Sequence, residues 1–582
     1  MKALRVSALS QLLSLALRKR KLLILGVSST LLGTFFTLFE PRLFGYAIDR
    51  VVLPKRWDLL TLFTLIYALV HLMRFVFGVI GEYLFGKLGQ EMMQDLRVAV
   101  FAKIQSLPIA TFERVPAGKL VTRVTYDIAS LSEVFSTGLV TLFKNILIVV
   151  GILIWLLVLN FRLGLIAASI FPILVWGAVY FTQRLHRAYR ETRKRISRLN
   201  AHLSETLMGM KTVMIFSQEK TRGQRYSKIN DQYAKSQIGT VKIYALFQPM
   251  ITICSGISMA LVLWFGGGMA EAGSIQLGVL SAFFAFAAGL FLPVRDIADK
   301  WNVILSGMAS AERIFDILKW KSEVKADALT APAKSLQGIR GHIVFEKVWF
   351  AYSGENWVFK DLSLEIKPGE KIGIVGHTGA GKSTIIGLLL RFYEPQKGRI
   401  LLDGRDLRDL DKRELRLAIG LVQQDVFLFS GSVEENWSLW REAAPGVALA
   451  VESMMDEMGL KDRFKVELQE KGSNLSSGEK QCIAFARAMA ASPAVWVMDE
   501  ATSHIDSESE QKMSLWLRRI TESKTLILIA HRLATVRATD RILVMNHGVL
   551  AEHGTHDELM QRNGIYYRLY QCQEMQEFAE EP

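Results

Sequence analysis

Six long apolar stretches in the N-terminal half constrain the fold of this 582-residue chain more than any other feature. A helix needs about 20 apolar residues to cross about 30 Å of hydrocarbon. Inside a bilayer a helix also satisfies all of its own backbone hydrogen bonds. The N-terminal half is therefore predicted to be an all-α transmembrane domain of six spans. We place the spans at Leu22–Phe39, Leu59–Val79, Leu139–Leu159, Leu163–Phe181, Ala245–Phe265 and Leu277–Leu292.

The net charge of +14 is concentrated beside these stretches. Basic residues cluster at Arg18–Lys21 and again between Arg184 and Arg198, a pattern typical of cytoplasmic segments at an anionic membrane face. We therefore expect both termini and the long connections after spans two and four to be cytoplasmic. Residues 1–20 are predicted to be an interfacial helix that contacts membrane lipid. Because the charge has this membrane explanation, we expect no nucleic-acid partner.

Span two carries ionisable side chains within its apolar sequence. His71, Arg74 and Glu82 fall within about 80° of one another on a helical wheel, so they share one face. An arginine near mid-bilayer costs about 2.5–3.5 kcal/mol, which favours a cavity or a neighbouring helix over lipid. Two interpretations stay open: this face lines a substrate path, or it forms interhelical pairs. Lys144 in span three is interpreted as a residue that extends its charge towards the interface.

A phosphate-binding loop lies in the C-terminal half, between an apolar strand at Lys371–Val375 and an apolar helix at Thr384–Leu390. Glycines let backbone N–H groups curl around phosphates, and a helix N-terminus favours negative charge. Lys382 is expected to reach the terminal phosphates, and Ser383 to hold Mg²⁺. The sequence therefore predicts ATP and Mg²⁺ as cofactors. The nucleotide-binding residues are Gly376, His377, Thr378, Gly379, Ala380, Gly381, Lys382, Ser383 and Thr384.

A second apolar strand, from Val495, ends in the carboxylates Asp499 and Glu500. A buried strand would deliver Asp499 to Mg²⁺ through water. Glu500 could polarise the water that attacks the γ-phosphate. These residues predict ATP hydrolysis as well as ATP binding.

Several further motifs, in the same order along the chain, resemble those of ATP-binding cassette exporters. The resemblance assigns adenine stacking to Tyr352 in Val348–Tyr352 and a magnesium-sensing role to Gln424. It matches Leu475–Glu479 to the family signature LSGGQ, with Ser476 and Gly478 contacting nucleotide bound to a second subunit. Ser503–Asp506 resembles the loop that contacts the other subunit, and His531 resembles the switch histidine that orients Glu500.

The resemblance covers essentially the whole chain and implies a domain order. Residues 21–320 would form the six-helix transmembrane domain with long cytoplasmic helical extensions, 321–338 a linker, and 339–582 a C-terminal α/β P-loop nucleotide-binding domain. It implies ATP-driven export of an unidentified amphiphilic or lipid-like substrate across the cytoplasmic membrane of a bacterium, by one half of a dimeric transporter. Segments expected to transmit force are Thr125–Ile128 and Phe216–Glu219.

The signature reads LSSGE in this chain, and the departure concerns the partner subunit. Ser477 adds a side chain where backbone approaches phosphate, and Glu479 adds negative charge near nucleotide. An intact set of catalytic residues with an altered signature resembles the glutamate-retaining subunit of bacterial heterodimeric multidrug exporters of this family. The resemblance therefore implies a heterodimer with a second half-transporter. A homodimer stays open.

Two other functions are compatible with a membrane domain joined to an ATPase. A channel or regulator of the same architecture could use ATP for control without transport, although Glu500 and His531 favour turnover. An importer is disfavoured because spans and ATPase are fused. The substrate cannot be read from the sequence, because a fold does not specify its cargo.

Overall fold

The computed structural model describes residues 2–323, 338–439, 446–459, 466–499, 507–530 and 533–580. The chain folds into two compact units. One is helical and contains residues up to Leu107 and from Val115 to the end of the last membrane helix. The other contains the nucleotide-binding fold together with Pro108–Arg114, a short segment from between the second and third spans.

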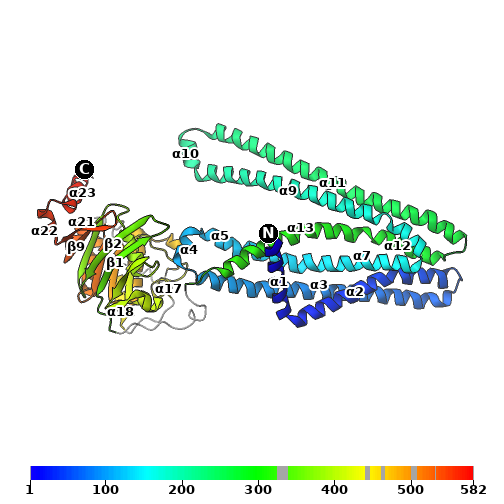
Figure 1. Cartoon of the computed structure of the whole chain (residues 1–582), viewed down its shortest axis with the longest axis horizontal. Helices are drawn as coiled ribbons and strands as arrows, with labels where there is room; N and C mark the ends of the chain where they lie inside the picture. The colour runs from blue at the N-terminus through cyan, green and yellow to red at the C-terminus, as the bar shows by residue number, and fades with distance from the viewer. Residues whose placement is uncertain are drawn as a thin grey trace. The chain divides into compact units, whose positions relative to one another are not determined.

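The helical unit consists of long helices joined by short turns, drawn from blue to green in Figure 1. Its elements are α1 (Lys2–Arg18), α2 (Arg20–Ala47), η1 (Ile48–Val52), η2 (Trp57–Leu59), α3 (Leu60–Gln105), α5 (Ala117–Thr122), η3 (Arg123–Asp127), α6 (Ile128–Glu133), η4 (Val134–Gly138), α7 (Leu139–Leu159), α8 (Phe161–Ala168), α9 (Phe171–Met208), α10 (Met210–Ile215), α11 (Glu219–Glu271), α12 (Leu277–Gly289) and α13 (Phe291–Lys319).

Within the described residues, six helical segments are long and apolar enough to cross a membrane, and each contains one of the predicted spans. They are Arg20–Val52, Trp57–Gln105, Ala117–Leu159, Phe161–Met208, Glu219–Glu271 and Leu277–Lys319. The prediction of six spans is confirmed. At 1.5 Å per residue the second segment is about 70 Å long, more than twice the thickness of the hydrocarbon. The helices therefore continue well beyond the bilayer, as their polar sequences beyond the spans predict.

The helices pair along their length in a way that fixes which side chains meet. α2 packs along α3, and α9 packs along α11 with α10 at the tip between them (Figure 1). α12 crosses α2 near the C-terminal end of α2, where the backbone of Gly278 lies against that of Gly45. Small residues at such crossings allow close backbone approach between membrane helices.

The nucleotide-binding unit contains two β-sheets. A four-stranded antiparallel sheet has the order β2 (Trp357–Ile366), β1 (Ile343–Ala351), β4 (Lys397–Leu402), β5 (Arg405–Asp406). A six-stranded sheet has the order β10 (Val549–Gly554), β9 (Arg541–Asn546), β3 (Lys371–Gly376), β8 (Thr525–Ile529), β7 (Val495–Asp499), β6 (Ile419–Val422). All neighbours from β9 to β6 are parallel, and β10 runs antiparallel to β9.

The helical elements of this unit are α4 (Ile109–Arg114), α15 (Lys382–Leu389), η5 (Leu407–Asp409), α16 (Lys412–Ala418), α17 (Val433–Ser438), α18 (Val447–Glu457), η7 (Glu470–Gly472), α19 (Ser477–Ala490), α20 (Ser507–Ile520), α21 (Leu533–Val536), α22 (His556–Gln561) and α23 (Ile565–Glu580).

The parallel strands are buried on both faces, as their continuous apolar sequences predict. Along β7, Trp496 and Met498 pack into one core with α19, whereas Val495 and Val497 pack into a second core with α15 and the four-stranded sheet. The sheet therefore separates two apolar cores, and its ends are free to carry polar groups. The expected combination of an all-α six-span domain and an α/β P-loop domain is the observed fold.

Candidate nucleotide site

The phosphate loop leaves the carboxyl end of β3, the strand between β9 and β8, and enters α15 directly. Gly376, Gly379 and Gly381 have φ values of 152°, 83° and 101°, which L side chains rarely adopt. A Cβ at Gly376 would lie 2.2 Å from the carbonyl oxygen of Met545, and one at Gly381 would lie 2.5 Å from the ring of Phe359. Glycine at the two ends of the loop is therefore required by backbone conformation and by space.

The lysine of the loop is held inside it. Lys382 is buried, and its Nζ donates to the carbonyl oxygen of Gly376 at 2.7 Å and to that of His377 at 3.2 Å. Ser383, the next residue, is exposed at the start of α15. A helix N-terminus with an ammonium group and an accessible hydroxyl fits the phosphates and Mg²⁺ of a nucleotide.

The strand that carries the predicted carboxylates ends at the same edge of the sheet. Asp499 is the last residue of β7, and it pairs with Ile529 of β8, which in turn pairs with Ile374 of β3. The phosphate loop begins two residues beyond Ile374, so Asp499 and the loop share the carboxyl edge. This placement fits the predicted magnesium role of Asp499. Glu500, Ser503–Asp506 and His531 lie outside the described residues.

The predicted adenine platform is held by an aromatic cluster. Tyr352 follows β1, and its ring makes edge contacts with Phe350 at 4.9 Å and Tyr393 at 5.0 Å between ring centroids. Its hydroxyl lies 3.0 Å from Oγ1 of Thr384, one turn into α15. The ring is 43% exposed, so a face remains open for stacking next to the phosphate loop.

Gln424 follows β6, the edge strand, and its side chain is exposed. Its backbone carbonyl accepts a hydrogen bond from Nε2 of Gln481 at 3.2 Å, which links the loop to α19. The structure thus places Gln424 near the carboxyl edge of the same sheet, with its side chain accessible.

The signature segment lies at the start of α19, on the side of the edge strand. β3 and β6 are separated by β8 and β7, so the segment is associated with a strand about 14 Å from the one that carries the phosphate loop. Ser476 caps α19: its Oγ accepts from the backbone N–H of Glu479 at 3.2 Å, and its own N–H donates to Oε2 of Glu479 at 2.7 Å. The unusual Glu479 therefore completes a capping box and places its carboxylate at the helix N-terminus.

Sequence reasoning missed the contribution of α4 to this region. Arg114 donates from Nη2 to the backbone carbonyl of Tyr352 at 3.3 Å. Glu113 accepts a hydrogen bond from the hydroxyl of Tyr393. Burial, together with this carboxylate, raises the pKa of Tyr393 well above its usual range, so the hydroxyl stays a donor. No local motif marks these residues, because Glu113 and Tyr393 are far apart in the sequence.

The expected force-transmitting segment Thr125–Ile128 lies in the helical unit. Asp127 is half-buried there and accepts hydrogen bonds from Arg313, Arg123 and Ser310. The segment grouped with the nucleotide-binding unit is α4, and the role of Thr125–Ile128 stays a prediction. Phe216–Glu219 forms the turn between α10 and α11 with Phe216 exposed, and its role stays a prediction.

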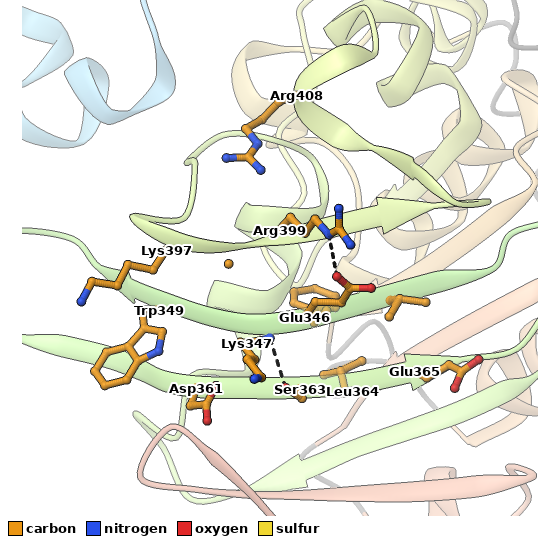
Figure 2. A pocket seen from close by; sticks show the side chains of 13 residues that line it. Glu346, Lys347, Trp349, Asp361, Ser363, Leu364, Glu365, Lys397, Arg399 and Arg408 are labelled. Carbon is orange, nitrogen blue, oxygen red and sulfur yellow. Dashed lines mark hydrogen bonds and ion pairs between the residues drawn. The ribbon is translucent and has the colours of Figure 1, made fainter.

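A groove of about 890 Å³ runs over the four-stranded sheet and holds none of the predicted nucleotide-binding residues (Figure 2). Arg399 donates to Glu346 across it at 2.5 Å, and Nζ of Lys397 lies 5.3 Å from the ring centre of Trp349. Arg399 and Glu346 pair with each other, while Arg408 and Glu365 pair with Asp406 and His342, which do not line the groove.

Comparison with known families supports the two-unit description. Residues 23–294 match the family described as "ABC transporter transmembrane region", and residues 359–503 match the family described as "ABC transporter". The second match spans the phosphate loop, the signature segment and β7.

Similar proteins match nearly the whole chain. An uncharacterized ABC transporter ATP-binding protein, YknV, of Bacillus subtilis is 33% identical and covers 95% of this chain and 92% of its own length. The fatty acid ABC transporter ATP-binding/permease protein of Mycobacterium tuberculosis is 34% identical over 82% of this chain and 76% of its own length. The ATP-dependent lipid A-core flippase of Thiobacillus denitrificans is 30% identical over 92% of both chains. A solved structure of a bacterial Atm1-family ABC exporter with ATP bound aligns with a TM-score of 0.78, at 27% identity, over 95% of this chain and 98% of that one.

Proposed function

Because this chain belongs to the ATP-binding cassette transporter family, whose exporters couple ATP hydrolysis to transport, we propose that it exports an amphiphilic or lipid-like molecule across a bacterial cytoplasmic membrane. The observation that carries the proposal is the fusion of six membrane helices to a domain in which the phosphate loop and Asp499 share the carboxyl edge of one sheet, while Tyr352, which follows β1 of the other sheet, lies within 3.0 Å of Thr384 in the helix that follows the loop. Relatives named as a fatty acid transporter and a lipid A-core flippase support a lipid-like cargo. The alternative of a non-transporting channel or regulator is not favoured.

The proposed division of labour follows the geometry. Tyr352 stacks on adenine, while the loop amides and Lys382 hold the phosphates. Ser383, Gln424 and Asp499 hold Mg²⁺, which neutralises charge on the phosphates when bound. Glu500 orients the attacking water and His531 orients Glu500, with both assignments resting on sequence. Alternating access follows if closure of two such domains on ATP turns the membrane cavity outward and hydrolysis resets it.

The powering role of ATP is tested by Lys382→Ala in inside-out membrane vesicles that express the transporter. We expect ATP-dependent uptake of a fluorescent lipid or amphiphile to fall to background, because the loop loses the ammonium group that is proposed to bind the terminal phosphates. Lys397→Ala, on the groove of the four-stranded sheet, is the matched control and should retain uptake. Undiminished uptake in Lys382→Ala would refute the proposal.

The partner proposed is a second half-transporter with an intact signature. In a composite site, the N-terminus of α19 would face the γ-phosphate bound by the partner. The Glu479 carboxylate already occupies the neighbourhood of that N-terminus, so it opposes the approach of another anion. The site closed by this chain's signature is therefore expected to turn over slowly, which favours a heterodimer.

The oligomeric proposal is tested with the chain purified alone in detergent or nanodiscs. We expect weak ATPase activity that increases several-fold when the partner half is co-expressed. Robust activity of this chain alone, abolished by Glu500→Gln, would instead establish a functional homodimer.

A further inference from the structure

Four polar side chains meet between α2 and α3 inside the membrane spans. Glu40 of α2 accepts a hydrogen bond from Nη1 of Arg74 through Oε2, and one from the hydroxyl of Tyr67 through Oε1 at 3.3 Å. Nε2 of His71 lies 3.5 Å from the same Oε1. The rings of Tyr67 and His71 are 4.8 Å apart. The interhelical pairing left open from the sequence is therefore present at this position.

The cluster lies within the two apolar helices that contain the first and second candidate spans. Glu40 is about 18 Å from the end of η1, and Arg74 is about 21 Å from the start of α3, at 1.5 Å per residue. A charged pair between membrane helices is costly, and ionisable residues at such positions pair with one another, face the bundle interior and mark substrate paths.

The exposed, unused hydrogen-bonding capacity of the cluster belongs chiefly to Arg74. Each carboxylate oxygen of Glu40 already has a partner, and its side chain is only 19% exposed. Nδ1 of His71 has no partner among the described residues, but it is buried. Arg74 uses Nη1 alone among the described residues, although a guanidinium carries five N–H donors. Its side chain is 41% exposed, so a ligand that approaches this cluster meets open cationic donors before it meets an acceptor.

An apolar surface adjoins the cluster. The ring of Tyr67 lies 6.3 Å from the ring of Phe44, one helical turn from Glu40 on α2. Phe44 lines a hollow of about 450 Å³ whose other walls come from α12, chiefly Leu277, Leu280 and Phe284. The volume lies in the range of small-molecule sites. A molecule with a polar end at Arg74 could place an alkyl chain along Phe44 towards this hollow.

We propose that Arg74, oriented by Glu40, binds the headgroup of an oxyanion amphiphile, a carboxylate or a phosphate monoester, whose alkyl chain packs on Phe44 and the hollow beside α12. The guanidinium fork matches the two oxygens of either headgroup. A cationic amphiphile would have to compete with Arg74 and Tyr67 for Glu40. The inference rests on the proposed export of amphiphiles and narrows its substrate class.

The test compares four probes with the same twelve-carbon chain: laurate, dodecyl phosphate, dodecyltrimethylammonium and dodecyl maltoside. The full-length transporter is reconstituted in zwitterionic nanodiscs, with its partner half if one is needed for ATPase activity. We expect laurate or dodecyl phosphate to stimulate the ATPase, and the cationic and neutral probes to have little effect. Arg74→Gln should raise the half-stimulating concentration of the anionic probe by about tenfold or more.

Three further variants separate binding from folding. Arg74→Lys keeps the charge but loses the fork, so its half-stimulating concentration should be intermediate. Glu40→Gln combined with Arg74→Gln leaves no orphan charge and should lose the preference for anions while remaining monodisperse. Lys144→Gln removes a different intramembrane cation, 3.9 Å from Glu82, and should behave as the parent.

The relative potency of the two anionic probes identifies the headgroup, since either preference supports the proposal. Equal stimulation by the cationic and anionic probes, or identical responses of Arg74→Gln and Lys144→Gln, would overturn the anionic site while leaving export intact. If no amphiphile is moved in the vesicle assay, the proposed function itself fails, and this outcome is independent of Arg74.

Discussion

The hydrogen bond between Tyr393 and Glu113 joins α4 to the ring cluster around Tyr352, the proposed adenine platform. Tyr393 packs against Tyr352 with its ring, and its hydroxyl contacts the segment between the second and third spans. Arg114 holds the backbone of Tyr352 from the same segment. A nucleotide that stacks on Tyr352 therefore lies one side chain away from the contact with α4. We interpret the pair as the route by which adenine binding reaches this segment.

Replacement of Tyr393 by Phe keeps the ring contact and removes the hydrogen bond. The loss of a hydrogen bond to a charged group corresponds to about 1.5–3 kcal/mol, part of which is screened because Glu113 is solvent-accessible. We expect the amount of substrate moved per ATP hydrolysed to fall several-fold in proteoliposomes. Tyr567→Phe provides the control, because it removes a half-buried hydroxyl of α23 that accepts a hydrogen bond from Gln571, far from Glu113 in the sequence. If both variants move the same amount of substrate per ATP hydrolysed, the Tyr393 hydroxyl does not contribute to the coupling between hydrolysis and transport.

The phosphate loop shows what single residues in a sequence can and cannot predict. Its glycine spacing identified Gly376 and Gly381, because few residues tolerate the backbone that surrounds a phosphate. The ring of Phe359 that lies beneath Gly381 could not be identified, because it arrives from β2 through the fold. Glu113 and Arg114 were missed for the same reason, since tertiary contacts alone give them a role.

The crossing of α2 and α12 is the tightest helix contact described here. A Cβ at Gly278 would lie 1.9 Å from the carbonyl oxygen of Gly45 and 2.5 Å from the carboxylate of Asp49. Oδ1 of Asp49 accepts from the backbone N–H of Gly278 at 2.6 Å, at the first turn of α12. The carboxylate thus satisfies a helix N–H that would otherwise lack a partner in an apolar region.

Gly278→Ala should therefore separate α2 from α12 and lower the free energy of unfolding by about 1–3 kcal/mol. The measurement is the thermal midpoint of the detergent-solubilised protein, followed by size-exclusion chromatography. Gly268→Ala serves as the control, because nothing lies within 4 Å of a Cβ at that position in α11. If both variants melt together, the close approach of Gly45 and Gly278 contributes nothing to stability.

Element types were predictable, whereas element ends were not. Hydrophobic length alone located all six spans, since nothing else explains stretches that apolar. α3 extends to Gln105 through polar residues that do not by themselves mark where a helix ends. The sequence signal for its end is Pro108, because a proline disfavours the helical conformation of the residue before it. The role of Thr125–Ile128 stays a prediction, and its sequence does not reveal that Asp127 is bound by Arg313.

At the scale of the molecule, the altered signature would determine how the two nucleotide sites of the proposed dimer divide ATP hydrolysis between them. Glutamine in place of Glu479 could form the same capping box without its charge. Glutamate and glutamine at position 479 therefore differ in charge alone. The glutamate carboxylate and an incoming phosphate would compete for the positive end of the α19 dipole. Ser477 adds a side chain beside them.

The double variant Ser477→Gly, Glu479→Gln is expected to raise the maximal ATPase rate of the assembled transporter several-fold. The steady-state rate with saturating Mg²⁺ and ATP measures the effect, and Glu467→Gln provides a charge-matched control outside α19. The same rate in the double variant and the parent would mean that the signature of this chain does not limit turnover.

The assignment of α4 to the nucleotide-binding unit has a practical consequence for anyone who isolates the ATPase as a fragment. A polypeptide that begins after the last membrane helix lacks Pro108–Arg114, so Tyr393 loses its acceptor and the backbone of Tyr352 loses a cationic cover. Water would then fill the position that α4 occupies beside Tyr352 and Tyr393. Nucleotide affinities measured on such a fragment would therefore describe a more hydrated site, and they should differ from those of the intact transporter.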